Sequence, residues 1–524
     1  MRNLYYLTPP ERTKNPKLAD EFRQKPLKEW ISALPAANLG LTIRKFHDRI
    51  VEMNAIEIDP EVLLEALDTF YPVYQSAEEF LLGRLIGKSY PLASDEQKIG
   101  QLAEVVGRDY LIGYSIVLKD MSGRGASWRF SRSLPRVVSR LIRCLSRILL
   151  LRYLLRLPEP EWIWLDLHAL YLLAVEKEKQ DTKLKEEEDS VPVSIETLYK
   201  QILLLRLADP WGLGHREIFD IYESSENWSD SVALKLLKPG SVPQGGTIYA
   251  DEDKPPSLKA EDCPDSRVYS IEMDGLLAKL SELLERSDRS VGRFDLVNAD
   301  SQRALGFPAP LLEYLRDRWF GADAAQHNLF EDRNPRVLSI GLKATHQQLN
   351  PPTNPTEKIL ADWLVTVNED QSLRCEFDQA GQIFLGSLVS LKLVDLESAR
   401  RVLGVVNRIW MHRLDGAVNF QISVLSPQVL AAGIQPVMAK KELQVYQRAL
   451  LYFSESSSGR KANLVLESQK LKSGNVVQLL SHEDPMKVRL DNRNNIAPGF
   501  WSFECIRLVE AKKETIPAKG YDFL

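Results

Sequence analysis

Hydrophobic positions recur with two different periods along the chain. Before about residue 330, apolar residues recur every three or four positions, as in the segment 27–34, and this spacing forms one apolar stripe on a helix. From Arg336 onward the period becomes two, as in the segment 418–424, where apolar and polar residues alternate. The pattern predicts an α+β multidomain protein: an all-α N-terminal part followed by an antiparallel β-barrel or sandwich.

Within the helical part, several polar residues have the positions of helix starts. Asp59 precedes Pro60, and the segments 94–97 and 194–198 each begin with a serine. We expect an N-cap at Asp59, a capping box at 94–97 and another N-cap at Ser194. The succession of helices fits either a solenoid of the tetratricopeptide kind or a compact bundle, because no strict 34-residue repeat is present.

In the second part, short strand-like runs follow one another about ten residues apart. They occupy residues 389–393, 401–410, 418–424, 463–467, 475–480, 487–490 and 500–508, with a loop expected at 427–440. This spacing is typical of a barrel or sandwich. The last four runs form either a second small β unit or the completion of the first.

Changes in composition give provisional domain boundaries. Residues 1–235 are expected to form a helical scaffold and 236–330, rich in Pro, Gly, Asp and Ser at its start, a loop-rich connector with helices. Residues 331–440 should form the barrel, and 441–524 the second β unit or an extension of it.

The bulk composition is that of an ordinary globular protein. The chain has 524 residues, 44% of them hydrophobic and 27% charged, and a net charge of −5, which gives no reason to expect DNA as a partner. Its four cysteines are far apart, and no apolar run reaches the roughly 18 residues of a membrane span. We expect a cytoplasmic protein with reduced cysteines.

No catalytic motif is visible. The sequence has no Walker A loop, no dinucleotide fingerprint and no metalloprotease or serine-hydrolase motif, and its seven histidines are scattered. We therefore expect no enzyme activity, no cofactor and no metal site.

Four arginines share one face of an expected helix that begins near Leu134. Arg136, Arg140, Arg143 and Arg147 are offset by 0, 4, 7 and 11 positions. They could form a surface for a protein partner or for peripheral contact with anionic lipid. The alternative is that they pair with neighbouring carboxylates inside the fold, which an acidic chain supplies in number.

Several stretches resemble a family of proteobacterial proteins that have a large helical N-terminal region and a C-terminal PilZ-like β-barrel. The matching stretches are Trp162–Tyr171, Ile340–His346, Gly386–Leu391, Leu403–Trp410 and Phe420–Leu425. By this resemblance the first is a helix of the N-terminal region, the second opens the barrel as a strand, and the other three lie in its sheet.

The resemblance implies binding of the second messenger cyclic di-GMP. PilZ domains use an Arg-x-x-x-Arg motif before the first strand and an Asp/Asn-x-Ser-x-x-Gly motif in the barrel. Arg333 and Arg336 resemble the first motif with one residue fewer between them, and Asp370 and Ser372 resemble the second, with Cys375 in place of its glycine. Guanidinium groups suit the phosphates and guanine edges of such a ligand.

We expect these four residues, with Arg374 beside them, to form a divergent ligand site. The implied function is a signalling receptor that relays cyclic di-GMP to an unidentified protein partner governing motility, pili or exopolysaccharide. The alternative is a non-enzymatic scaffold whose barrel has kept the fold and lost the nucleotide.

Overall fold

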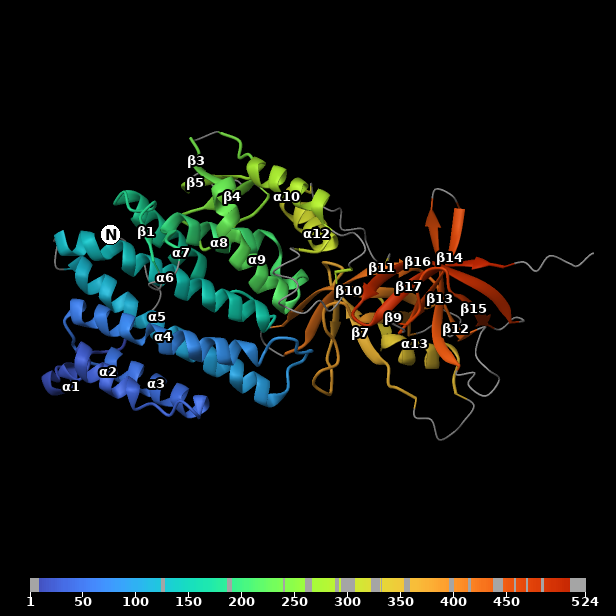
Figure 1. Ribbon diagram of the computed structural model, residues 1–524, viewed down its shortest axis with the longest axis horizontal. Helices are drawn as coiled ribbons and strands as arrows, with labels where there is room; N and C mark the ends of the chain where they lie inside the picture. The colour runs from blue at the N-terminus through green and yellow to red at the C-terminus, as the bar shows by residue number, and fades with distance from the viewer. Residues whose placement is uncertain are drawn as a thin grey trace, which may run out of the picture.

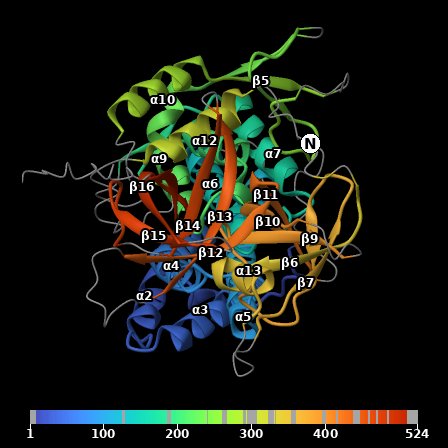
Figure 2. The same cartoon turned by 90° about the vertical axis from the view of Figure 1, so that its right-hand side faces the viewer.

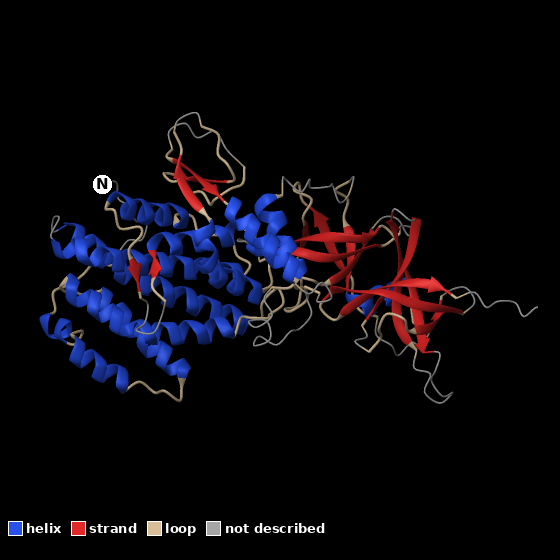
Figure 3. Ribbon diagram, turned by 45° about the horizontal axis from the view of Figure 1, so that its top comes forward, coloured by secondary structure: helices blue, strands red, loops and turns tan. Residues whose placement is uncertain are grey.

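The protein consists of a helical body and two β-barrels that follow one another along its long axis (Figure 1). The computed structural model describes the chain except for residues 1–8, 124–127, 186–190, 239–240, 260–265, 288–291, 294–306, 322–329, 331, 353–358, 395–399, 413–415, 437–445, 457–458, 468–469, 482–484 and 509–524. Helices gather at one end and most strands at the other, as Figure 3 shows. The expected α+β class is confirmed.

The helical body is a compact bundle. Its helices are α1 (Pro16–Asp20), α2 (Gln24–Ser32), α3 (Leu39–Asn54), α4 (Pro60–Gly83), α5 (Ser94–Gly123), α6 (Trp128–Leu154), α7 (Ile163–Glu176), α8 (Ile195–Leu207) and α9 (His215–Trp228). Two short 3₁₀ helices, η1 (Pro210–Gly212) and η2 (Ser229–Ser231), and a hairpin of β1 (Lys183–Leu184) and β2 (Val193–Ser194) complete it. Helix α6 contacts α5, α7, α8 and α9, whereas a solenoid repeat contacts only its neighbours.

Side-chain caps explain where two of these helices begin. The Asp59 carboxylate accepts a hydrogen bond from the Glu61 amide at 3.0 Å, and Ser194 Oγ accepts one from the Thr197 amide at 3.1 Å. Both predicted caps are confirmed. The capping box predicted at 94–97 is wrong: α5 already includes Ser94, and the Glu96 carboxylate accepts from the Ala93 amide at 2.9 Å.

A small mixed segment follows the bundle. Strands β3 (Ala233–Leu236), β4 (Gly246–Tyr249) and β5 (Val268–Glu272) form an antiparallel sheet in the order β3-β5-β4. Helices α10 (Asp274–Arg286) and α12 (Ala309–Phe320) come next. The buried Trp319 of α12 donates its indole N–H to the Leu204 carbonyl of α8 at 3.1 Å, which fastens this segment to the bundle.

The first barrel is a closed antiparallel sheet with the strand order β10-β11-β8-β7-β6-β9. Its strands are β6 (Arg336–Ile340), β7 (Trp363–Val367), β8 (Leu373–Cys375), β9 (Leu388–Leu393), β10 (Val402–Met411) and β11 (Val418–Ser426). The strand expected over Ile340–His346 is wrong, because β6 ends at Ile340 and α13 (Gly341–Leu349) follows. Gly341 turns the chain with a φ of 84°, and Leu342 is buried between the two barrels.

The C-terminal strands close into a second barrel with its own core. They are β12 (Val429–Pro436), β13 (Gln447–Ser456), β14 (Gly459–Leu466), β15 (Val476–Leu480), β16 (Met486–Ala497) and β17 (Phe500–Arg507). Thus the loop expected at 427–440 contains a strand, and this barrel begins at Val429, ahead of the boundary expected at 441. Ala431, Ala432 and Gly433 hid this strand, because small residues give little hydrophobic alternation.

The first barrel is joined to the helical body by backbone hydrogen bonds. Tyr90 and Ile383 exchange two of them, at 2.7 and 2.9 Å, and the Met411 amide donates to the Arg156 carbonyl at 2.7 Å. Figure 2 views the molecule with the barrels in front of the helical body. Within the described part of the chain, no helix is long and apolar enough to cross a membrane.

Candidate ligand site in the first barrel

The segment that leads into β6 lies beside the turn that joins β7 to β8. An Arg333 Nη atom lies 3.2 Å from a carboxylate oxygen of Glu369, and Arg336 pairs with Val365 in the β6–β7 register. The structure thereby brings Arg333 and Arg336 close to the turn that contains Asp370 and Ser372. Closure of the sheet explains this, because antiparallel pairing of β6 with β7 places the start of one beside the end of the other.

Arg336 is buried and held by local contacts. Its guanidinium lies 3.7 Å from the centre of the Phe330 ring, and its Nη atoms lie 3.0 Å from Asp332 Oδ1 and 2.8 Å from the Asn334 carbonyl. The side chain is 6% exposed. Arg336 therefore shapes the loop before β6, whereas Arg333, with a side chain 58% exposed, is the arginine that faces solvent.

The predicted Asp-x-Ser motif forms a tight turn. Asp370 Oδ1 accepts from the Ser372 amide at 3.0 Å and from the Ser372 hydroxyl at 2.6 Å. Between them, Gln371 has a φ of 61°, which L-residues adopt at a cost. The Ser372 side chain is fully buried, so its hydroxyl sets the shape of the turn, while Asp370 is exposed.

Two asparagines that the sequence did not single out extend this network. Asn368 Nδ2 donates to Ser372 Oγ at 2.8 Å and lies 3.2 Å from Asn419 Oδ1 on β11. Asn368 could have been suspected, since it lies only two residues before Asp370, directly after β7. Asn419 could not, because only the pairing of β11 with β8 brings it close.

Arg374 and Cys375 end the motif on β8. Arg374 pairs with Asn419 across the sheet, and its guanidinium lies 3.2 Å from Glu376. Cys375 is buried, and burial raises the pKa of its thiol to about 12. A side chain that packs into the core thus replaces the glycine that would have left the backbone open to a ligand.

The charges around the site nearly balance. Each guanidinium of the site has a carboxylate partner: Asp332 for Arg336, Glu369 for Arg333 and Glu376 for Arg374. An anionic ligand would therefore compete with a carboxylate for at least one arginine. The exposed pair of Arg333 and Glu369 is the easiest to separate, since solvent screens it.

The four helix arginines mostly turn toward carboxylates of α4. Arg136 lies 2.7 Å and Arg140 3.5 Å from Asp68, and the Arg140 guanidinium also stacks 3.5 Å from the centre of the Tyr71 ring. Burial raises the pKa of the Asp68 carboxyl, with the two arginines opposing it. These contacts favour the interpretation in which the arginines pair with carboxylates inside the fold over the one in which they form a surface for lipid.

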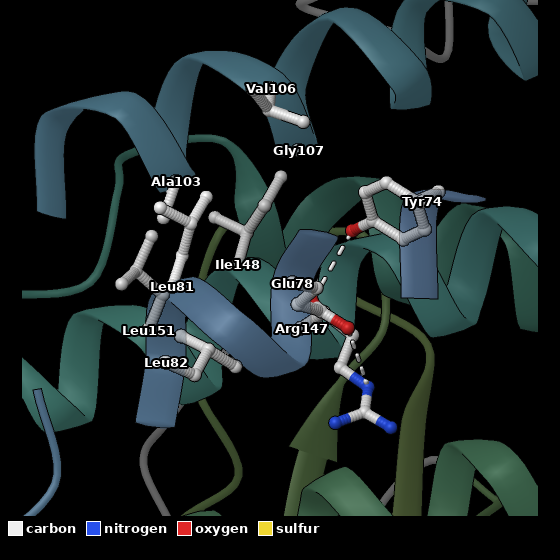
Figure 4. Close-up of a pocket in the computed structure, with 10 residues that line it drawn as sticks. All are labelled: Tyr74, Glu78, Leu81, Leu82, Ala103, Val106, Gly107, Arg147, Ile148 and Leu151. Atoms are coloured by element: carbon white, nitrogen blue, oxygen red, sulfur yellow. Dashed lines mark hydrogen bonds and ion pairs between the residues drawn. The ribbon is translucent and has the colours of Figure 1, made fainter. Parts of the chain in front are cut away.

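Figure 4 shows the next contact along this face. Arg147 points toward Glu78, 3.5 Å away, and Tyr74 lies 3.3 Å from the same carboxylate. Burial raises the pKa of Glu78 as well. Arg143 is half-buried, and burial lowers its pKa. The Arg136 side chain is 54% exposed, which is more than the side chains of Arg140 and Arg147.

No cluster of three or more metal-binding side chains occurs among the residues that the structure describes. The site in the first barrel offers hydrogen-bond donors and charge, and its one thiol, at Cys375, is buried.

Comparison with known proteins points to one class. Residues 25–240 match the family model for the N-terminal domain of the cyclic-di-GMP receptor FimW. The matched region runs from α2 to just beyond β3. The chain is also 23% identical to the cyclic-di-GMP receptor FimW of Pseudomonas aeruginosa, over 92% of this chain and 90% of that protein. These findings confirm the resemblance found in the sequence. No solved structure matches the chain.

Proposed function

We propose that this chain is a non-enzymatic receptor for cyclic di-GMP, with its ligand site between Arg333 and the 368–374 segment. Similarity to a cyclic-di-GMP receptor over nearly the whole length supports the ligand class. The contact between Arg333 and Glu369 carries the assignment of the site, because it joins the two segments that resemble the two binding motifs.

Physical chemistry supports a dinucleotide in this position. Arg333 presents a forked donor that matches a phosphate or the O6/N7 edge of guanine. Arg374, with a side chain 25% exposed, adds a second guanidinium next to the turn. The ligand would take the place of Glu369 on Arg333, and the Asp370 carboxylate would accept hydrogen bonds from a guanine.

The same proposal includes a relay to a protein partner. Backbone hydrogen bonds of Tyr90, Ile383 and Met411 join the first barrel to the helical body. A conformational change in the barrel can therefore be passed to the bundle through these contacts. We propose that the bundle presents the signal to a partner that governs motility, pili or exopolysaccharide.

A second candidate function is a scaffold whose barrel does not bind nucleotide. Two observations favour it: the Arg336 guanidinium is already engaged by Asp332 and Phe330, and Cys375 stands where the motif has glycine. In this candidate function, the helical body provides the surface that binds protein partners.

Calorimetric titration of the full chain separates the two functions. A receptor should release or absorb heat with cyclic di-GMP at micromolar concentrations and show at least tenfold weaker binding of cyclic di-AMP, which lacks the guanine O6 acceptor. Absence of heat with tens of micromolar cyclic di-GMP, together with capture of a partner that nucleotide does not affect, would establish the scaffold instead.

A further inference from the structure

A concavity lined by several basic residues lies where the helical body meets the first barrel. It is a cleft of about 770 Å³ bounded by the end of α8, residues 254–259, helix α12 and strand β10. Its basic lining residues are Arg206, Lys254, Lys259, Arg318 and Arg408. Among the lining residues that the structure describes, Asp209 is the one acidic residue.

Asp209 is shared by two of these arginines. Arg408 Nε lies 2.9 Å and an Arg318 Nη atom 3.5 Å from the same carboxylate oxygen. The Asp209 side chain is 12% exposed, whereas those of Arg318 and Arg408 are 40% and 30% exposed. One carboxylate cannot neutralise two guanidiniums, and the arginines are the groups that reach the open cleft.

The backbone of Asp209 is itself unusual. Its φ of 56° lies in the left-handed region, which costs a non-glycine residue on the order of 1 kcal/mol. Tyr314 donates its hydroxyl to the Asp209 carbonyl at 3.2 Å and helps to hold this conformation. Such strain is found at functional sites more often than elsewhere.

Aromatic rings fix the positions of the arginines. The guanidiniums of Arg206 and Arg408 lie 5.1 and 5.7 Å from the centre of the Trp211 ring, and that of Arg318 lies 5.2 Å from the Tyr314 ring. Arg206 also pairs with Glu159 at 2.8 Å. The donors are therefore arranged before any ligand arrives, which reduces the entropy lost on binding.

We propose that this cleft binds a phosphate-bearing small molecule of up to nucleotide size, at a site separate from the one in the first barrel. The phosphate takes the place of the Asp209 carboxylate between Arg318 and Arg408. The lysines of the rim, Lys254 and Lys259, add charge on the side of the β4–β5 segment. The volume falls within the range of small-molecule pockets, about 300–1,000 Å³.

Inorganic pyrophosphate and ATP are suitable probes, titrated calorimetrically into the full chain at low salt. Both should bind, with affinity falling as salt rises. The double variant Arg318→Gln plus Arg408→Gln should bind pyrophosphate at least tenfold more weakly. Asp209→Asn should bind it several times more tightly, because it removes the competing negative charge. Arg286→Gln, on the exposed surface of α10, is the matched control and should change nothing.

Further variants distinguish a loss of binding at this cleft from damage to the fold and from binding elsewhere. Lys259→Gln, at the exposed rim, should weaken binding severalfold with an unchanged melting temperature, even if Arg408→Gln disturbs the junction. Arg333→Ala should leave pyrophosphate binding intact, which separates this site from the proposed cyclic di-GMP site. Vesicles that contain phosphatidylglycerol test whether a lipid headgroup supplies the phosphate instead.

The proposal is overturned if neither probe binds, or if the Arg318→Gln plus Arg408→Gln and Lys259→Gln variants bind pyrophosphate as tightly as the wild type. It is also overturned if these variants affect only flotation with vesicles. Tighter binding by Asp209→Asn would be the most specific support, because damage to the fold weakens binding.

Discussion

Arg333 and Glu369 are 36 residues apart in the sequence, and their side chains meet at 3.2 Å. Both side chains are well exposed, at 58% and 91%, so the pair stabilises the fold by less than about 1 kcal/mol. Glu369 thus binds Arg333 weakly, and an anionic ligand would compete with Glu369 for this arginine.

The first prediction concerns this competition. Glu369→Gln should leave the melting temperature unchanged and tighten cyclic di-GMP binding two- to fivefold, since the variant removes a negative charge that the ligand must displace. Calorimetry and thermal unfolding measure the two quantities. Glu282→Gln, which removes a similar exposed pair with Arg286 on α10, is the control and should affect neither. Weaker binding by Glu369→Gln would mean that the carboxylate itself contacts the ligand.

The second prediction concerns the Asp-x-Ser turn. Ser372→Ala removes a buried hydroxyl that donates to Asp370 and accepts from Asn368, so it should lower the free energy of unfolding by about 1–3 kcal/mol. Urea denaturation measures this. Ser423→Ala is a matched control on β11, because Ser423 is exposed and accepts one hydrogen bond from Asn407. Equal effects of the two substitutions would contradict the role assigned to Ser372.

The third prediction separates the two interpretations of the helix arginines. Arg140→Ala leaves the mostly buried Asp68 with one arginine fewer and should cost about 3 kcal/mol of stability. Arg136→Ala, at the exposed end of the same network, should cost less than about 1 kcal/mol. If the face instead serves anionic lipid, both variants would unfold like the wild type and lose flotation with vesicles.

The fourth prediction follows from a buried histidine. Burial lowers the pKa of His168 to about 4, although its hydrogen bond to the Lys254 carbonyl and the nearby Asp253 and Asp251 act in the opposite direction. Between pH 6.5 and 4 the unfolded chain binds a proton that the folded chain does not. His168 therefore makes the free energy of unfolding fall as the pH falls through this window, by about 3 kcal/mol in all.

His168→Gln isolates this contribution, since glutamine can still donate to the Lys254 carbonyl. The stability of the wild type relative to the variant should decrease as the pH is lowered from 7 to 5. A difference that does not depend on pH would show that His168 is not buried as a neutral ring.

Much of the fold could be predicted from local signals. The change of period at Arg336 marks the start of β6, and the caps at Asp59 and Ser194 lie where expected. Helix α13 was missed, because its buried face forms only against the two barrels: Thr345 lies 3.0 Å from Ser390 of the first barrel, and His346 lies 3.0 Å from the Ala432 carbonyl of the second. Local patterns carry no information about such contacts.

The candidate site could be predicted only in part, because local patterns again carry no information about contacts between distant strands. Arg333, Asp370 and Ser372 lie in recognisable motifs, and the structure brings their segments together. Asn419 joins them only through strand pairing. The cleft at the junction could not be foreseen, because Asp209 and Arg408 are 199 residues apart and only the fold brings them together.

Titration of the full chain and its Arg333→Ala variant with cyclic di-GMP is the most direct test of a ligand site at Arg333. Arg333 is the solvent-facing arginine of the site, and its loss leaves the contact of Arg336 with Phe330 in place. The wild type and the control Arg286→Ala should bind with micromolar or tighter affinity, and Arg333→Ala and its combination with Arg336→Ala should bind at least ten times more weakly. Equal affinity in all four proteins, or no binding by the wild type, would contradict a ligand site at Arg333.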